Sequence, residues 1–202
     1  PELRRALEQL GQQNILNSLF SLDNSKEESA RFSDRTVNEL LKAVYEMAKV
    51  KTGALIVIEK NTPLHEYERT GITLDSLLSS QLLINIFEHN TPLHDGAIIV
   101  RGDRVISATC YLPLSDNMFL SKELGTRHRA AVGVSEVSDS LTIVVSEETG
   151  KVSVAADGKL MRDLKEDELR VQLVEAQNKS QETGRFKLWK GRVKKREKNA
   201  DR

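Results

Sequence analysis

The chain has 202 residues, enough for one domain of ordinary size with a buried core. Its 30 Lys and Arg side chains balance 30 Asp and Glu side chains, so the overall charge favours no nucleic-acid partner and anion binding must come from local clusters. Cys110 is the only cysteine, which excludes an intrachain disulfide and a cysteine-based metal site and fits a reducing compartment. No apolar run approaches the roughly 18 residues of a membrane span.

Two helices are predicted in the N-terminal quarter of the chain. Apolar residues recur at helical spacing after Pro1, and we expect a helical lead-in over residues 1–31 that ends in a polar loop. Ser33 or Asp34 can cap a second helix over residues 36–51. Its apolar positions share one helical face, which we expect to be buried: Val37, Leu40, Leu41, Val44 and Ala48.

A strand, a loop and a helix are predicted next. Gly53 is expected to end the preceding helix, and the β-branched run at 54–59 is typical of a buried strand. A charged loop follows. Thr73 or Asp75 can then cap a helix over residues 76–90.

Two β-hairpins and two helices are predicted in the rest of the chain. Gly102-Asp103 is a good two-residue hairpin turn, and a second turn falls near residues 148–150. The strands are expected at 97–101, 104–111, 141–146 and 151–155, and the helices at 125–139 and 165–177.

The mixture of helices and hairpins favours an α/β fold, a single domain whose central mixed β-sheet is surrounded by α-helices. We divide the chain into a helical lead-in (1–31), a central domain (32–164), a C-terminal helix (165–177) and a polar tail (178–202). The tail carries ten basic and three acidic residues and is typical of a weakly ordered segment.

His94-Asp95-Gly96-Ala97 is the first segment that could carry chemistry. On spacing alone it is typical of an Asp-Gly turn that leads into a strand. The alternative is a carboxylate at the end of the sheet, where Gly96 lets a ligand approach the backbone closely. Asp95 could then hold a divalent metal or accept a proton from a hydroxyl nucleophile, with His94 as a neighbouring metal candidate.

Residues 126–129 (Thr-Arg-His-Arg) form a cationic cluster at the start of a predicted helix. Thr126 can be its N-cap. Cations repel the positive end of a helix unless an anion offsets them, and phosphate suits both the backbone amides and the guanidinium groups. A solvated basic turn, or pairing with Glu123 or Glu136, fits the pattern equally well.

Residues 146–150 (Ser-Glu-Glu-Thr-Gly) follow a strongly apolar strand. The simplest interpretation is a solvated hairpin turn. Alternatively, a carboxylate here could join Asp95 or a phosphate in binding a divalent metal, and Ser146 could donate to a phosphate. The three segments together supply the groups for metal-assisted nucleotidyl or phosphoryl transfer, without a Walker-type loop or a GxGxxG motif.

These motifs in combination resemble the diadenylate cyclase domain, which condenses two ATP molecules into cyclic di-AMP and two pyrophosphates. The resemblance runs from about residue 32 to 164, and the opening PELRRALEQLG is similar to the segment after the membrane helices in the membrane-bound class. The stretches that carry it are GALIVIE at 53–59, HDGAIIV at 94–100, ATCYLPLS at 108–115, GTRHRAA at 125–131 and VVSEETGKVSVA at 144–155.

The resemblance implies a mixed sheet wrapped by helices, a Mg²⁺ or Mn²⁺ cofactor and a role for each motif residue. Asp95 would assist deprotonation of the ribose 3′-hydroxyl, and Gly96 and Ala97 would line the site. Tyr111 and Leu112 would contact the adenine. The phosphates would be bound by Thr126, Arg127, His128, Arg129 and Ser146. The metal would be bound by Glu148 and Asp95, with His94 as a further candidate ligand.

The two-fold symmetric product indicates a face-to-face homodimer with one ATP in each subunit. We further expect that the chain, which begins at Pro1, is the cytoplasmic domain of a longer bacterial protein anchored in the cell membrane and contacted by regulatory proteins.

Three alternatives to the cyclase remain open: a sensor that binds ATP or a cyclic dinucleotide without catalysis, another nucleotidyl or phosphoryl transferase, and a scaffold that binds partners.

Overall fold

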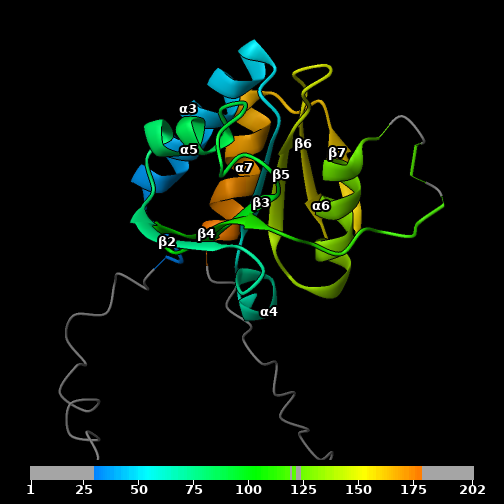
Figure 1. The fold of residues 1–202 in the computed structure, drawn as a ribbon, viewed down its shortest axis with the longest axis horizontal. Coiled ribbons are helices and arrows are strands. Elements are labelled where there is room, and N and C mark those ends of the chain that lie inside the picture. Colours follow the sequence, from blue (N-terminus) through cyan, green and yellow to red (C-terminus); the bar gives the residue numbers. More distant parts are fainter. Residues whose placement is uncertain (1–29, 119, 122–123, 179–202) are drawn as a thin grey trace, which may run out of the picture.

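A seven-stranded mixed sheet lies between two layers of helices (Figure 1). The computed structural model describes residues 30–118, 120–121 and 124–178. The strand order is β2-β4-β3-β1-β5-β6-β7; β1 and β3 run parallel, and the other neighbouring pairs are antiparallel. The strands are β1 (Ala54–Ile58), β2 (Ile72–Leu77), β3 (Ala97–Arg101), β4 (Arg104–Cys110), β5 (Leu141–Val145), β6 (Val152–Ala156) and β7 (Lys159–Arg162). The predicted α/β class with a mixed sheet is confirmed.

Helices cover both faces of this sheet. One face packs against α3 (Asp34–Val50), α5 (Ser80–Phe87) and α7 (Glu166–Gln177). The other face packs against α6 (Thr126–Val137), which stands apart from the other long helices in Figure 1. A short helix, α4 (His65–Glu68), lies between β1 and β2 in the chain.

Strand β1 shows how the sequence builds two cores. All five of its residues are buried, which explains its continuous apolar run. Because side chains alternate across a strand, Ile56 and Ile58 join the core beneath α3, whereas Leu55 and Val57 join the core beneath α6. Full burial of each such side chain contributes about 1.5–3 kcal/mol, so β1 fixes the middle of both layers.

The first long helix follows its prediction closely. Ser33 is the N-cap, and its hydroxyl accepts a hydrogen bond from the Thr36 backbone. The predicted face is buried, apart from Ala48, which is partly buried against the core. Gly53 does not end this helix; instead Lys51 adopts a left-handed conformation (φ 59°) and its amide closes the last turn.

The segment between β1 and α5 was predicted wrongly. The expected loop contains α4 and most of β2, and α5 begins at Ser80 with Ser79 as its N-cap rather than Thr73 or Asp75. Residues 72–77 instead form an edge strand paired with β4. This strand is mostly exposed and irregular in register, so it lacks the apolar alternation that would have identified it.

The predicted hairpins are confirmed, and the second continues into a strand that was missed. Gly102-Asp103 joins β3 to β4. After β6, Asp157 and Gly158 take positive φ angles (49° and 70°) and turn the chain into β7. Helix α6 spans Thr126–Val137, within the predicted range of 125–139. Its N-cap is Gly125, so the prediction of Thr126 as N-cap was wrong, and Thr126 is the first helical residue.

Strand directions bring several chain segments to one edge of the sheet. Pairing of Ala54 with Val145, and of Ala97 with Cys110, places the starts of β1 and β3 beside the ends of β5 and β4. The end of β7 reaches the same edge through β6. The predicted site residues therefore share this edge, together with the N-terminus of α6.

Most of the predicted lead-in and tail, residues 1–29 and 179–202, lie outside the described residues. In the part of the chain that is described, no helix has the length and apolar character needed to cross a bilayer.

Candidate active site

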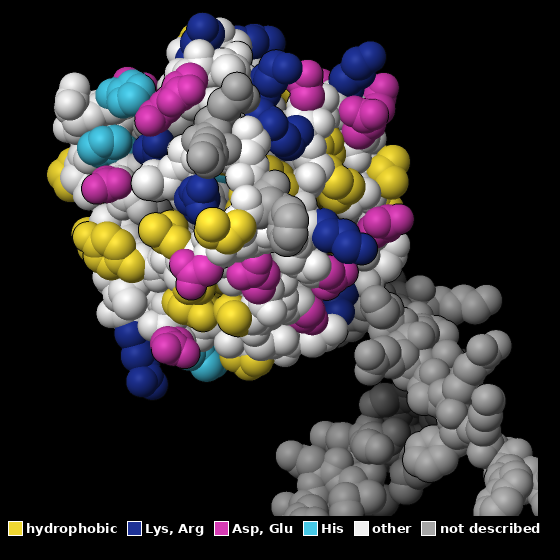
Figure 2. Space-filling model, turned by 90° about the vertical axis from the view of Figure 1, so that its right-hand side faces the viewer, with side chains coloured by type: hydrophobic (Ala, Val, Ile, Leu, Met, Phe, Trp, Pro, Cys, Tyr) yellow, Lys and Arg dark blue, Asp and Glu magenta, His cyan; other side chains and the backbone are white. Residues whose placement is uncertain are grey.

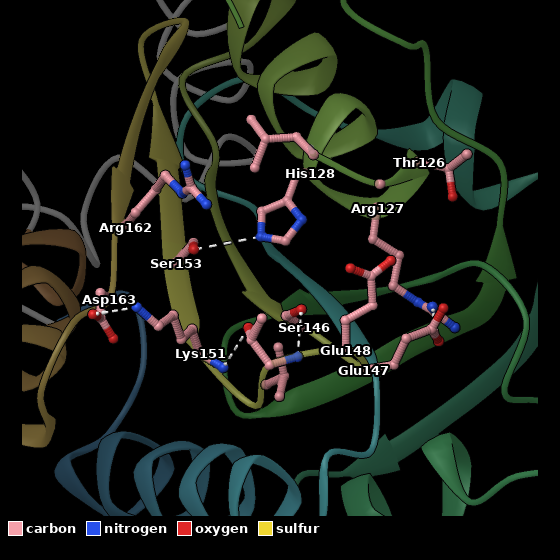
Figure 3. Close-up of a pocket in the computed structure, with 14 residues that line it drawn as sticks. Thr126, Arg127, His128, Ser146, Glu147, Glu148, Lys151, Ser153, Arg162 and Asp163 are labelled. Atoms are coloured by element: carbon pink, nitrogen blue, oxygen red, sulfur yellow. Dashed lines mark hydrogen bonds and ion pairs between the residues drawn. The ribbon is translucent and has the colours of Figure 1, made fainter. Parts of the chain in front are cut away.

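A pocket of about 590 Å³ opens at this edge, between the N-terminus of α6, the end of β5, the start of β6 and the end of β7 (Figure 3). Its walls come from three separate parts of the chain. Among the lining residues are five that the sequence singled out: Thr126, Arg127, His128, Ser146 and Glu148. On the face shown in Figure 2, side chains of both charge signs are interspersed, so the cations of this pocket are a local feature.

The first turn of α6 presents backbone amides to the pocket. Gly125 caps this helix without a side-chain hydrogen bond, whereas serines cap α3 and α5. The amides of His128 and Arg129 donate to the Gly125 carbonyl, at 3.2 and 3.3 Å. The preceding amides and the helix dipole make this end suited to an anion.

Arg127 is held by an ion pair at the rim of the pocket. Its guanidinium donates to the Glu147 carboxylate at 2.5 Å. The pair lies against Gly53, where an added Cβ would come within 2.9 Å of Glu147 and 3.0 Å of Arg127. A glycine therefore makes room for the pair. Of the predicted acidic partners, Glu136 instead accepts from the Ser115 hydroxyl, and Glu123 lies outside the described residues.

His128 forms part of the inner wall and is only 8% exposed. Burial, and to a smaller extent the charge of Arg162, lower its pKa below the ordinary value of 6.5. Its Nε2 lies 3.4 Å from the Ser153 hydroxyl. The imidazole is consequently neutral at pH 7 and can exchange hydrogen bonds without adding charge.

The turn after β5 orients Ser146 and exposes two carboxylates. The Gly150 amide donates to the Ser146 carbonyl at 2.8 Å, and the Thr149 amide donates to the Ser146 hydroxyl at 3.3 Å. The hydroxyl proton of Ser146 is thus free to point at a ligand. Glu148 is exposed and lines the pocket, as Figure 3 shows.

Asp95, Gly96 and Ala97 lie at the same edge but do not line this pocket. Asp95 is exposed, and Ala97 is fully buried. Gly96 has φ 106°, and a Cβ there would approach the backbone of Thr109 and Cys110 to about 3 Å (2.9–3.0 Å). Only glycine fits both the angle and the contact, so the backbone beside Asp95 is closely fixed.

Tyr111, Leu112 and Arg129 also lie outside the pocket wall. Tyr111 is 68% exposed, and its amide donates to the Thr70 hydroxyl at 2.9 Å. Leu112 packs partly against the core beneath α6. The Arg129 carbonyl accepts from the Ser115 amide at 3.0 Å, which ties α6 to the segment that carries Tyr111.

No preformed metal centre is found among the described residues, where no three His, Cys, Asp or Glu side chains cluster in a way that could hold an ion. The His94 Nδ1 atom lies 2.6 Å from the Thr91 carbonyl, which occupies one ring nitrogen. Mg²⁺ commonly takes one or two carboxylates together with phosphates and water. Asp95 and Glu148 fit a metal of that kind, one that arrives with a phosphorylated substrate.

Three charged residues of the pocket were not predicted from the sequence: Lys151, Arg162 and Asp163. The Lys151 ammonium donates to Asp163 at 2.7 Å, and Arg162 extends from β7 toward His128 (Figure 3). Asp157-Gly158 is the same kind of hairpin signal as Gly102-Asp103 and could have revealed β7.

The segments that form this site lie within a region shared with a known protein family. The family model for DAC, described as DisA bacterial checkpoint controller nucleotide-binding, matches residues 41–160, more than half of the chain. The chain belongs to the DAC family. Both the pocket-lining start of α6 and the Asp95 loop fall inside the matched range.

Named members of the DAC family are close in sequence. The cyclic di-AMP synthase CdaA of Bacillus subtilis is 54% identical over 179 residues, which cover 89% of this chain and 63% of that protein. A diadenylate cyclase of Listeria monocytogenes is 55% identical over 169 residues, or 84% of this chain and 60% of that protein. The chain therefore spans about three fifths of these relatives.

The fold is also shared with a solved DAC structure. A crystal structure of DacA from Staphylococcus aureus, a double mutant, matches with a TM-score of 0.70 and 53% sequence identity. The match covers 71% of this chain and 95% of that one. The family implies a divalent metal in general, which agrees with the two carboxylates at the site edge.

Proposed function

We propose that this chain is a diadenylate cyclase, which joins two ATP molecules into cyclic di-AMP and releases two pyrophosphates. The observation that carries the proposal is the convergence of Arg127, His128 and Ser146 on the open N-terminus of α6, within a DAC-family fold. Backbone amides, a guanidinium and a hydroxyl suit a triphosphate and the charge that develops on it during transfer.

Each half of the reaction forms one bond and breaks one. The 3′-oxygen of one ribose bonds to the α-phosphorus of the other ATP, the bond from that phosphorus to the β-phosphate oxygen breaks, and pyrophosphate leaves with its electron pair. The proton of the 3′-hydroxyl passes to Asp95, whose exposed carboxylate directly precedes the closely fixed Gly96. Repetition in the opposite sense closes the ring.

Asp95 and Glu148 would hold Mg²⁺ or Mn²⁺, with His94 as a further candidate. Such an ion, when bound, neutralises charge on the phosphates and on the departing pyrophosphate. In the same proposal, Gly96 and Ala97 line the ribose side, Tyr111 and Leu112 contact the adenine, and the phosphates are held by Thr126, Arg127, His128, Arg129 and Ser146.

Catalysis by this arrangement needs two subunits. The product has two equivalent linkages, so the simplest geometry holds one ATP per subunit and joins two sites about a two-fold axis. Asp95 and Tyr111 are exposed at the site edge, where they are open to a second copy. Dilution should therefore lower the specific activity, and full activity of a strictly monomeric copy would contradict the dimer.

For the longer protein we propose a membrane anchor before this domain and contacts with regulatory proteins, with the described domain on the cytoplasmic side. The support is its resemblance to the membrane-bound class and the part of each curated relative that the chain does not span.

Asp95→Asn separates a cyclase from a sensor that binds nucleotide without catalysis. The cyclase account predicts that product formation falls by roughly 10²–10⁴-fold, the typical contribution of general acid–base catalysis to a rate. The affinity for ATP should change by less than about threefold, because the base acts on the proton in transit and not on the bound phosphates. Asp157→Asn, in the turn at the opposite edge of the sheet, is the matched control and should keep both the turnover and the ATP affinity of the unmodified protein. Undiminished turnover by the Asp95 variant would refute its role.

A further inference from the structure

Three cations line the pocket, and they differ in how they are neutralised. Arg127 is paired with Glu147 at 2.5 Å, and Lys151 is paired with Asp163 at 2.7 Å. Arg162, at the end of the edge strand β7, has no hydrogen bond or ion pair through its side chain anywhere in the described part of the chain. An exposed guanidinium without an anionic partner, at the wall of this pocket, can bind an anion.

The position of Arg162 along the sheet edge shows which part of a nucleotide it can reach. In strand order, Asp95 precedes β3, Ser146 follows β5 two strands further on, and Arg162 ends β7 two strands beyond that. Neighbouring strands lie about 4.8 Å apart, so the distance from β3 to β7 is on the order of 19 Å. A nucleotide with its ribose at Asp95 and its inner phosphates near Ser146 would extend its last phosphate toward Arg162.

The orientation of the side chain agrees with this direction. In Figure 3 the guanidinium of Arg162 points from β7 across the pocket toward α6 and His128. Its charge is felt at His128, where burial and then Arg162 lower the imidazole pKa. Arg162 therefore acts on the pocket interior and is not simply a solvated charge on an edge strand.

We propose that Arg162 is a specificity-determining residue that binds the terminal phosphate of the nucleotide and makes the pocket select triphosphates over diphosphates. This inference rests on the proposed function, because it assumes that ATP occupies the pocket with its phosphates at α6. It assigns β7 a direct role in substrate choice.

The test compares Arg162→Gln with the matched control Lys159→Gln. Lys159 is an exposed cation at the start of the same strand and does not line the pocket. Dissociation constants for a non-hydrolysable ATP analogue and for ADP are measured by calorimetry with Mg²⁺. One charge-assisted hydrogen bond corresponds to about tenfold in affinity or more. Arg162→Gln should weaken the ATP analogue by about that factor and ADP by less than about twofold, and Lys159→Gln should change neither.

Two results would overturn the proposal while leaving the cyclase intact: unchanged binding of the ATP analogue to Arg162→Gln, or equal weakening of the analogue and ADP. In both cases the unmodified protein still binds the analogue. Failure of the unmodified protein to bind the ATP analogue would instead refute the proposed function, and the role of Arg162 with it.

Discussion

The guanidinium of Arg127 donates to the carboxylate of Glu147 at 2.5 Å, so one of the cations placed for a phosphate already has an anionic partner. The two residues come from different elements, the start of α6 and the turn after β5. A phosphate that enters the pocket must share or displace Glu147. The cationic cluster at the helix start is thereby stabilised in the absence of ligand, at the expense of some affinity for it.

Glu147→Gln should tighten nucleotide binding, because it removes the competing carboxylate while keeping a similar shape. The pair is partly exposed, and exposed ion pairs are worth about 0.2–1 kcal/mol, which corresponds to about 1.4- to fivefold in the dissociation constant. A fluorescence titration with a non-hydrolysable ATP analogue measures this change.

A double-mutant cycle with Arg127→Gln distinguishes competition within the pair from a general effect of charge. If Glu147→Gln tightens binding equally when Arg127 is absent, the carboxylate acts through the overall field of the pocket and the pairwise account is wrong.

Gly133→Ala should destabilise the protein by about 1–3 kcal/mol through overpacking. An added Cβ would lie 2.1 Å from the Pro113 carbonyl oxygen and 2.8 Å from the Ser115 amide nitrogen, and backbone atoms there cannot move aside cheaply. Urea unfolding followed by circular dichroism gives the difference. Gly125→Ala, whose Cβ would meet nothing within 4 Å, is the control and should lose less than about 1 kcal/mol. Equal stability of Gly133→Ala and the unmodified protein would mean that α6 is not held tightly on this segment.

The lowered pKa of His128 predicts a pH-dependent contribution to stability. The unfolded chain binds a proton at this imidazole more readily than the folded protein does, so the contribution is complete above pH 6.5 and is lost as the pH falls through the lowered folded pKa. Unfolding free energies measured at intervals between about pH 5 and 8 should therefore decline toward the acid side. In His128→Gln this part of the slope should be absent; an identical slope in both proteins would assign it to other groups.

Strongly periodic or capped segments could be predicted from the sequence, and weakly patterned ones could not. Ser33 and the apolar face of α3 follow local rules, as does the Gly102-Asp103 hairpin. Strand β2 was not predicted because it is an exposed edge strand. Thr73 and Asp75 resemble helix caps, but Thr73 pairs with Ser107 of β4, and Asp75 lies at the irregularity in that pairing.

The site could be predicted in part for similar reasons. The Thr-Arg-His-Arg cluster stands out in the sequence as a basic motif at a helix start, and Thr126, Arg127 and His128 do lie in one pocket with Ser146 and Glu148. Their chemical roles stay predictions. The pairing of Arg127 with Glu147 joins residues 20 positions apart and depends on the crossing of β5 beneath α6, which no local pattern reveals. Arg162 was missed because its strand was missed.

The most direct test of the central claim is the product formed from ATP. The protein at high concentration, with ATP and either Mn²⁺ or Mg²⁺, is analysed by liquid chromatography and mass spectrometry, with its fold verified by circular dichroism. The account predicts cyclic di-AMP, with two pyrophosphates released for each molecule formed. A folded protein that yields no cyclic di-AMP under these conditions would contradict it.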